Sequence, residues 1–290
     1  MYLSVIIPAF NEEKRLPETL KKIRNHLQNQ KYDWEVLIIN DGSKDKTAAV
    51  VSELIKNWQA RSERSRGGFR LIDNKENCGK GAVVKQGMLE AKGEWRLFMD
   101  ADNSTDLSEI EKLWEFARQS PQSTGSSRPS EASLPTRSAS ALDRAPRPAR
   151  VTLEGHGSLP CEGHYDIIAG SRYLKKDSIK IKQPLIRRMV SRIGNVLIRI
   201  LLGLNMADTQ CGFKMFSVRA TKEVFPLQTI ERWGFDMEIL AISIKKGYKI
   251  KEVAVYWYDS TGSQVKKSAT LKTLKELLII KWHLIKGKYS

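Results

Sequence analysis

Two carboxylates one residue apart follow a short hydrophobic run about a third of the way along the chain. Asp100 and Asp102 come directly after the apolar residues 97–99, within the stretch WRLFMDADNST. In an extended segment alternate side chains point the same way, so both acids can face one point beyond the end of a buried strand. Such paired oxygen ligands suit a hard divalent cation, which in turn suits a diphosphate. The same residues also suit a polar turn, because Asp, Asn and Ser are common in turns.

Four apolar segments in the amino-terminal part of the chain have the length and composition of buried strands, and helical apolar patterns separate them. These segments are residues 3–8, 34–39, 69–72 and 95–99. Strands and helices in alternation, with short connections, predict an α/β fold with a Rossmann-like, mostly parallel sheet flanked by helices. The polar loops after the strands then meet at the carboxyl edge, where such sheets bind ligands.

The loops at this edge carry groups suited to different parts of a ligand. Glu12 and Asp41 would repel a phosphate, so a binding role means accepting hydrogen bonds from sugar, base or amide donors. Gly79, Lys80 and Gly81 would let backbone and one ammonium approach a phosphate, although the P-loop spacing is absent. Each loop taken singly has the composition of an ordinary turn, and only their convergence on one edge favours a binding site.

The composition limits the kind of protein this is. With 290 residues, 41% of them hydrophobic, the chain can bury one large core or two smaller ones. Its three cysteines show no paired metal-ligand spacing, so we expect neither disulfides nor zinc, which fits a reducing compartment. We expect neither a signal peptide nor a membrane-spanning helix, since no window offers about 18 uncharged apolar residues.

The net charge of +16 favours an anionic partner, which leaves nucleic acid and anionic lipid as candidates. Residues 170–205 hold nine Lys or Arg residues against one acid, Asp177, and residues 263–290 are also basic. Both segments interleave these charges with Leu and Ile, which favours a membrane surface over a nucleic-acid groove. We therefore expect an anionic lipid surface as a partner, and no nucleic acid.

Two segments predict amphipathic C-terminal helices. In residues 185–204 the aliphatic residues fall on one broad side and most arginines on the other, which suits a membrane interface as well as a core helix with a solvated face. In the last segment five apolar residues share a helical face: Leu271, Leu274, Leu278, Trp282 and Ile285.

Residues 120–163 differ in composition from the rest of the chain. They are rich in Ser, Pro, Ala, Arg and Gly and have almost no aliphatic periodicity. Such a segment cannot bury enough apolar surface to offset its ordering entropy, so we predict a disordered insertion. A single domain would then comprise residues 1–119 and 164–262, followed by a basic amphipathic segment at 263–290.

Seven motifs resemble the family 2 glycosyltransferases of the GT-A fold. They are PAFNEE at 8–13, NDGSKDKT at 40–47, NCGKGAVVKQG at 77–87, DADNS at 100–104, AGSRY at 169–173, DTQCGFKMF at 208–216 and RWGFDMEIL at 232–240. The last three narrow the resemblance to the dolichyl-phosphate glucosyltransferase branch, which is related to the dolichyl-phosphate mannose synthases. The resemblance covers almost the whole chain except residues 120–163.

This resemblance implies a GT-A catalytic domain and an inverting, metal-dependent hexosyltransferase that moves glucose from UDP-glucose to a polyprenyl (dolichyl) phosphate. Mg²⁺ or Mn²⁺ would act as a Lewis acid on the departing diphosphate. The enzyme would work as a peripheral membrane protein at the cytoplasmic face, held by its basic helices. The alternatives are mannose transfer from GDP-mannose, a family 2 transferase with a non-lipid acceptor, and nucleotide-sugar binding without turnover.

The resemblance also assigns residues to the donor. Nine would hold the nucleotide sugar: Pro8, Ala9, Asn11, Glu12, Asp41, Lys80, Asp100, Ala101 and Asp102. Of these, Asp100 and Asp102 would bind the metal ion. Ser104 is a candidate third ligand, at a position where mannose synthases often have Gln.

A second set is assigned to the acceptor side. Arg172, Arg187 and Lys214 would bind phosphates of donor or acceptor, a task that suits guanidinium forks. Asp236 joins Asp100 and Asp102 in the catalytic set. The acceptor phosphate is anionic at neutral pH, however, so a strong general base is not chemically required, and positioning and charge neutralisation would carry most of the acceleration.

Overall fold

The computed structural model describes residues 1–60, 66–117, 165–175, 185–258 and 269–289, with side chains except at 185–193 and 269–271. The predicted disordered insertion at 120–163 and the start of the predicted C-terminal segment, 263–268, lie outside the described residues.

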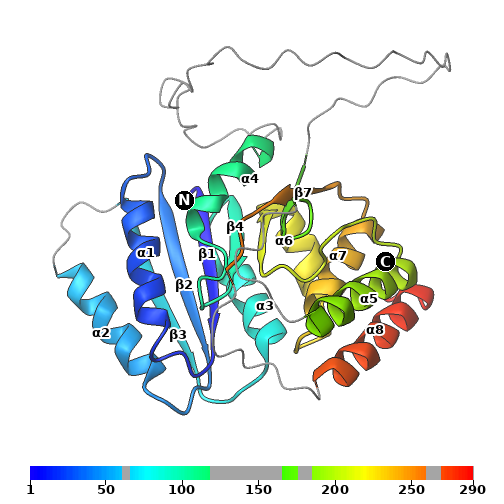
Figure 1. The fold of residues 1–290 in the computed structure, drawn as a ribbon. Helices are drawn as coiled ribbons and strands as arrows, with labels where there is room; N and C mark the ends of the chain where they lie inside the picture. Colours follow the sequence, from blue (N-terminus) through cyan, green and yellow to red (C-terminus); the bar gives the residue numbers. More distant parts are fainter. Residues whose placement is uncertain (61–65, 118–164, 176–184, 259–268, 290) are drawn as a thin grey trace, which may run out of the picture.

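Strands and helices alternate along the chain as the apolar patterns predict (Figure 1). The strands are β1 (Leu3–Ala9), β2 (Trp34–Asp41), β3 (Gly67–Asn74), β4 (Trp95–Met99), β5 (Ile167–Ser171), β6 (Phe213–Ser217) and β7 (Ile250–Ala254). The helices of a turn or more are α1 (Leu16–Gln28), α2 (Thr47–Gln59), α3 (Lys80–Glu90), α4 (Ile110–Ala117), α5 (Leu185–Leu202), α6 (Val218–Val224), α7 (Phe235–Lys245) and α8 (Ala269–Ile285).

The seven described strands form one sheet in the order β3-β2-β1-β4-β6-β5-β7. Strands β3, β2, β1 and β4 are parallel, β6 runs antiparallel to both β4 and β5, and β5 pairs in parallel with β7. The prediction of a mostly parallel sheet flanked by helices is confirmed. The antiparallel strand β6 is longer than the two apolar residues Met215 and Phe216 predict, because Phe213 and Lys214 also pair with β4.

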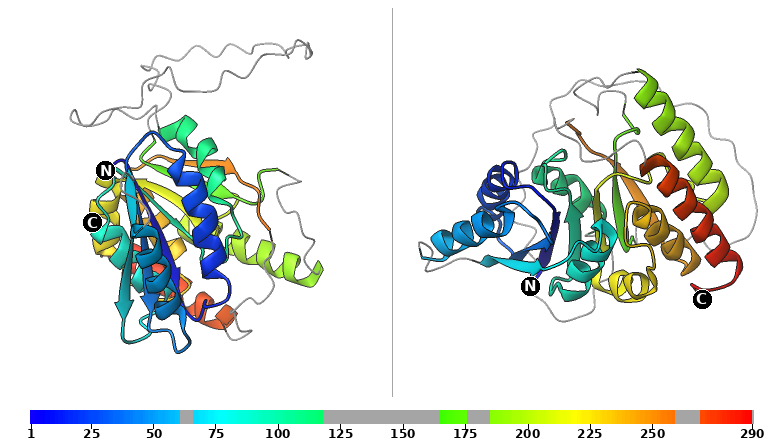
Figure 2. Two further views of the ribbon diagram at one scale, coloured as in Figure 1. Left: turned by 90° about the vertical axis from the view of Figure 1, so that its left-hand side faces the viewer. Right: turned by 90° about the horizontal axis from the view of Figure 1, so that it is seen from below.

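Helices cover both faces of the sheet and bury two cores (Figure 2). Alternate side chains of β1 enter different cores: Val5 and Ile7 pack with α1 and α4, whereas Ile6 packs with α3 and α7. All seven residues of β1 are buried, which explains why this strand reads as one continuous apolar run. The two-sided burial fixes the sheet as a rigid base for the loops at its edge.

Helices α5 and α8 pack side by side at the end of the sheet opposite β3 (Figures 1 and 2). The predicted shared face of α8 is confirmed for its described members, and it is the exposed face: Leu274, Leu278, Trp282 and Ile285. The inner face of α8 uses Leu277 and Ile280 instead. On α5 the broad aliphatic side divides, since Ile198 and Leu202 are buried while Val196, Leu197 and Ile200 are exposed.

Candidate active site

Strand direction brings five sequence-distant loops to one edge of the sheet. The loops after β1, β2 and β4 meet there because these strands are parallel. Since β6 runs the other way and Phe213 pairs with Met99, the loop before β6 arrives at the edge where β4 ends. β5 is antiparallel to β6, so Arg172, which follows β5, reaches this edge as well. The edge therefore gathers Asp100, Arg172 and the loop 208–212.

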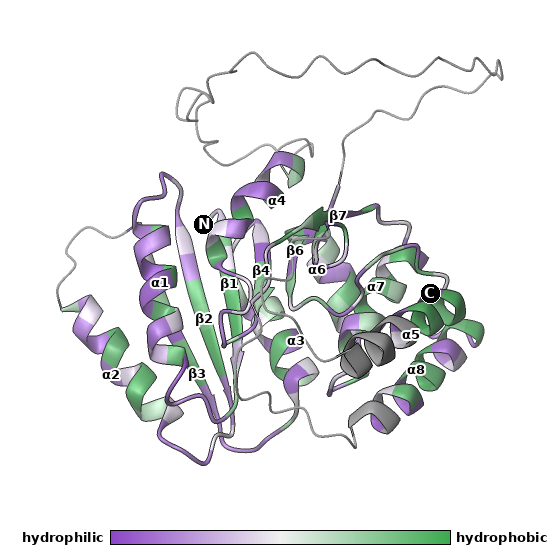
Figure 3. Ribbon diagram, viewed as in Figure 1, coloured by the Kyte–Doolittle hydropathy of each residue, from purple (hydrophilic) through white to green (hydrophobic). Residues whose placement is uncertain are grey.

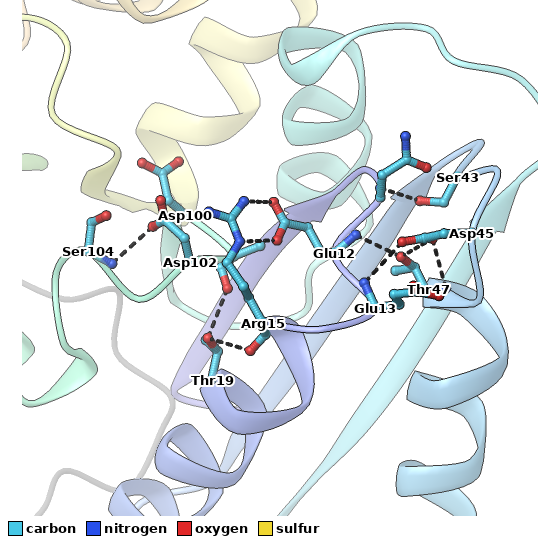
Figure 4. Close-up of polar contacts among 12 residues, drawn as sticks. Glu12, Glu13, Arg15, Thr19, Ser43, Asp45, Thr47, Asp100, Asp102 and Ser104 are labelled. Atoms are coloured by element: carbon cyan, nitrogen blue, oxygen red, sulfur yellow. Dashed lines mark hydrogen bonds and ion pairs between the residues drawn. The ribbon is translucent and has the colours of Figure 1, made fainter. Parts of the chain in front are cut away.

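The loops after β1 and β2 fix each other through backbone amides (Figure 4). The Asn11 N–H donates to the Ser43 hydroxyl (2.9 Å) and the Glu12 N–H donates to the Thr47 hydroxyl (2.8 Å). In return the Asn11 side chain accepts from the Lys44 N–H at 2.9 Å. Asn11 has a φ of 55°, a left-handed conformation that Asn adopts more readily than most residues. The predicted nucleotide-binding loop is thus held in place before any ligand arrives.

Glu12 forms a forked ion pair with Arg15 beside Asp102 (Figure 4). The Arg15 Nε donates to Oε2 at 2.7 Å and Nη2 donates to Oε1 at 2.5 Å. Burial raises the pKa of Glu12, and Arg15 opposes this shift, whereas the nearby Asp102 carboxylate adds to it. Arg15 therefore offsets negative charge where two acids of the site converge.

Asp41 holds the loop that leads into α3. Its carboxylate accepts from the Cys78 N–H (2.7 Å), the Gly79 N–H (3.0 Å) and the Asn77 amide (2.9 Å). Gly79 has a φ of 103°, a conformation that side chains rarely permit. Burial raises the pKa of Asp41, and the two backbone donors oppose the shift. The sequence predicts that Asp41 faces the nucleotide. In this structure its carboxylate holds the loop that precedes Lys80.

Lys80, the first residue of α3, pairs with Asp100 at 2.6 Å. Its ammonium also lies 5.6 Å from the ring centre of Trp233 and 5.9 Å from that of Phe235. Burial alone would lower the pKa of Lys80, but the charges of Asp100 and Asp236 outweigh it and hold the pKa above its ordinary value. Lys80 thus brings a permanent positive charge to the acid pair.

The acid pair at the end of β4 has a donor set that suits Mg²⁺ or Mn²⁺. Asp100 and Asp102 are both partly exposed at the strand end, and Asp102 accepts from the Ser104 N–H at 3.0 Å. No group of three or more His, Cys, Asp or Glu side chains suited to a metal ion occurs in the described ranges. Two carboxylates next to a diphosphate are a usual way of binding Mg²⁺, which takes remaining ligands from substrate and water. The buried Ser104 contributes here through its backbone to the orientation of Asp102.

Arg172 is held by Asp208, a residue to which the sequence assigned no role. Its Nε donates to Oδ2 at 2.7 Å, Nη2 donates to Oδ1 at 2.9 Å, and its backbone N–H donates to Oδ2 at 3.0 Å. Burial alone would raise the pKa of Asp208, but the Arg172 guanidinium outweighs it and keeps the pKa below its ordinary value.

The Arg187 side chain lies outside the described residues.

Lys214 and Asp236 form a buried ion pair between β6 and α7. The ammonium of Lys214, which has no exposed surface, donates to Asp236 and to the Cys211 carbonyl, both at 2.5 Å. The sequence predicts that Lys214 binds a phosphate. In this structure its ammonium pairs with Asp236 instead. Burial raises the pKa of the Cys211 thiol to about 12, so it stays protonated at neutral pH.

The remaining predicted donor residues supply backbone. Pro8, Ala9 and Ala101 are buried, and the Ala101 carbonyl accepts from the Thr19 hydroxyl at 2.9 Å. These three residues form the backbone at the ends of β1 and β4, next to the charged side chains of the candidate site.

Sequence reasoning missed four residues of the site: Arg15, Asn77, Asp208 and Trp233. Arg15 had a readable signal, because an Arg three positions after Glu12 on a helical turn can pair with it. Asp208 had no such signal, since its partner lies 36 positions away. Trp233 is exposed beside Lys80, a placement that depends on how the loop before α7 meets α3.

Comparison with known proteins agrees with this fold. The family Glycosyl transferase family 2 matches residues 4–145. Among solved structures, the glucosyl-3-phosphoglycerate synthase from Mycobacterium tuberculosis, crystallised with Mn²⁺, uridine-diphosphate and glucosyl-3-phosphoglycerate, is similar with a TM-score of 0.58. At 14% identity over 96% of this chain and 78% of that one, this likeness establishes the fold. The chain has the GT-A fold of a glycosyltransferase.

Named relatives indicate which branch of the glycosyltransferases the chain belongs to. The chain is 32% identical to a dolichyl-phosphate beta-glucosyltransferase of Trichomonas vaginalis, over 97% of this chain and 73% of the relative. It is 30% identical to the dolichyl-phosphate beta-glucosyltransferase of Saccharomyces cerevisiae, over 100% of this chain and 77% of that protein. The chain belongs to glycosyltransferase family 2, in the dolichyl-phosphate beta-glucosyltransferase branch.

Proposed function

We propose that this protein transfers glucose from UDP-glucose to a polyprenyl phosphate of the dolichyl type, with inversion at the anomeric carbon. One observation carries the proposal. The loop 208–212 begins at Asp208, which holds Arg172, and ends at Gly212, whose Cα lies against the Asp100 carboxylate. An acid pair suited to a metal-bound diphosphate and an arginine suited to a second phosphate are therefore joined by five residues.

On the donor side, Asp100 and Asp102 would hold Mg²⁺ or Mn²⁺. When bound, the ion supplies Lewis-acid neutralisation of charge on the departing diphosphate. Lys80 adds a fixed positive charge at the same place, because Asp100 and Asp236 keep it protonated. The loop around Asn11 and Glu12, tied to the β2 loop, orients the nucleotide.

On the acceptor side, Arg172 binds the polyprenyl phosphate and aligns one of its oxygens with the anomeric carbon. That oxygen forms the new bond to carbon while the bond from carbon to the UDP oxygen breaks on the opposite face, which gives inversion. The phosphate is already anionic at neutral pH, so no strong base is required. Asp236, paired with Lys214, contributes charge and position. The acceleration then comes from alignment and charge neutralisation.

The lipid acceptor places the enzyme at a membrane surface. No described helix is both long and apolar enough to cross a membrane. Exposed apolar side chains, here called the α5–α8 surface, stand on both helices: Val196, Leu197 and Ile200 on α5, and Leu274, Leu278, Trp282 and Ile285 on α8. In Figure 3 the ribbons of both helices carry hydrophobic residues, in green. Helix α8 also exposes lysines, at positions 272, 275 and 286. Exposed apolar side chains and lysines on the same helix favour peripheral attachment to an anionic lipid surface, as the cytoplasmic leaflet of a membrane offers.

Transfer assays test this function. Purified protein receives radiolabelled UDP-glucose or GDP-mannose and a short polyprenyl phosphate, with and without EDTA. We expect glucose transfer that EDTA abolishes and Mn²⁺ or Mg²⁺ restores, and we expect Asp102→Asn to lose transfer while circular dichroism shows an unchanged fold.

Other outcomes would contradict parts of the proposal. Mannose transfer in place of glucose transfer would reject the donor. Full activity in EDTA or in Asp102→Asn would reject the metal site. Nucleotide-sugar binding without transfer to any phosphate acceptor would reject the reaction.

A further inference from the structure

The backbone that carries Asp208 is held by a side chain from β7. The Glu252 carboxylate accepts from two successive N–H groups, Ala207 (Oε2, 2.7 Å) and Asp208 (Oε1, 2.9 Å). Two bonds from one carboxylate fix the direction of the backbone at this point. Asp208 itself is 1% exposed, so this segment has little freedom to shift.

A second side chain, Asn195 of α5, holds the same segment. Its amide nitrogen donates to the Ala207 carbonyl, and its amide oxygen accepts from the Thr209 hydroxyl at 3.0 Å. Asn195 thus contacts the residues on both sides of Asp208. The amide uses a donor and an acceptor at once, which neither a carboxylate nor an ammonium at this position could do.

These contacts lead to Arg172 through Asp208. The Asp208 carboxylate takes two guanidinium nitrogens and the backbone N–H of Arg172. A shift of the 207–209 backbone would therefore turn the guanidinium away from its present direction. Small displacements of a group that aligns a reacting phosphate cost large factors in rate or affinity.

We propose that Asn195 is a positioning residue for Arg172, acting through residues 207–209 to aim the guanidinium at the acceptor phosphate. This inference rests on the proposed function, in which Arg172 binds that phosphate. Asn195 is followed directly by Val196 and Leu197, which are exposed on α5. The helix proposed to rest on lipid thus also sets the direction of the arginine that receives a lipid-borne phosphate.

The test measures binding separately from turnover. Calorimetry in the presence of UDP gives the Kd for citronellyl phosphate, a short polyprenyl-type phosphate, and a separate titration gives the Kd for UDP with Mn²⁺. For Asn195→Ala we expect citronellyl phosphate to bind about tenfold more weakly, roughly 1.4 kcal/mol. The Kd for UDP should stay within about twofold, since Asn195 touches no donor residue. Thr209→Val, which keeps the side-chain shape, should show a smaller loss of the same kind.

Asn205→Ala is the matched control, because Asn205 is exposed in the same loop and its side-chain oxygen accepts a long hydrogen bond, 3.5 Å, from the exposed Arg199. It should bind both ligands as the wild type does. A double-mutant cycle with Arg172→Ala separates positioning from general destabilisation: once the arginine is gone, Asn195→Ala should weaken phosphate binding no further.

Three results would overturn the inference: wild-type phosphate binding by both Asn195→Ala and Thr209→Val, an equal loss of UDP binding, or independent losses in the cycle. Failure of the wild type to bind citronellyl phosphate at all would instead reject the proposed acceptor, and the inference with it. Failure to transfer glucose despite phosphate binding would reject the reaction and leave the inference supported by its own cycle.

Discussion

Asp100 owes its position to a neighbour that has no side chain. A Cβ at Gly212 would lie 2.2 Å from the Asp100 Oδ2 and 2.5 Å from its Cγ, closer than atoms can approach. The Lys80 ammonium pairs with Oδ1 of the same carboxylate at 2.6 Å. The acid is therefore confined between an ammonium and a backbone, which keeps it pointing at the edge of the sheet.

We expect Gly212→Ala to displace the Asp100 carboxylate and lower kcat/KM for glucose transfer by roughly a hundredfold, the cost of a misplacement of about 1 Å. Steady-state kinetics and Mn²⁺ binding by electron paramagnetic resonance measure the effect. Gly194→Ala is the control, since a Cβ there meets nothing within 4 Å. A fully active Gly212→Ala protein with normal Mn²⁺ binding would show that Asp100 tolerates displacement.

Three cationic side chains at this edge of the sheet each pair with one carboxylate. Arg172 pairs with Asp208, Lys80 with Asp100, and Arg15 with Glu12. Because each pair is neutral, these residues do not contribute to the net charge of +16. That charge comes from residues elsewhere in the chain. In the proposed function this balanced edge would take up a metal ion and two phosphates, and the remaining positive charge would favour an anionic lipid surface.

Helix α8 has two faces with separate tasks. Its inner face ties the loop before α7 in place, because Glu276 accepts from the Gly234 N–H at 2.7 Å and the nearby Tyr289 hydroxyl donates to Glu238 at 2.6 Å. Its outer face exposes the apolar residues of the α5–α8 surface, with Ile285 70% exposed. Changes on the outer face therefore test membrane attachment without removing the inner contacts.

The double variant Leu278→Glu with Trp282→Glu should bind vesicles containing anionic lipid at least about a hundredfold more weakly, since two buried apolar side chains together contribute about 3–6 kcal/mol. Flotation with phosphatidylserine vesicles measures binding. Leu89→Glu, on an exposed position of α3, is the matched control and should float normally. Unchanged flotation of the double variant would reject α8 as a contact with lipid.

The molecule as a whole is two cores on either side of one sheet, and the site lies where the sheet changes direction. Parallel strands deliver the donor loops, and the reversed β6 delivers the loop 208–212 to the same edge. The buried pair of Lys214 on β6 and Asp236 on α7 links the sheet to the helix layer at this point. Removing one member would leave an uncompensated buried charge.

Lys214→Met should therefore lower the free energy of unfolding by about 3–5 kcal/mol, as measured by urea denaturation. The double change Lys214→Met with Asp236→Leu should recover much of this loss, because apolar residues of similar volume can replace a buried ion pair. A single variant as stable as the wild type would mean that water or structural relaxation compensates Asp236.

Much of the fold follows from local patterns in the sequence. Continuous apolar runs determine β1, β2 and β4 as strands buried on both faces, and their alternation with helices determines a mostly parallel sheet. The polar residues after those runs were readable as an edge site because strand ends of a parallel sheet must meet. The periodicity also predicted the apolar face of α8, whose orientation it left open.

The tertiary structure alone decided which charged groups distant in sequence face one another. The sequence does not specify that β6 is reversed, and this reversal brings Asp208 to Arg172 and Gly212 to Asp100. Burial of Lys214, and the exposure of the apolar face of α8, depend on which neighbours pack against them. Strand runs and helical stripes arise from neighbours in sequence, so the sequence determined them. Pairing across tens of residues depends on packing the whole chain, so only the folded molecule could decide it.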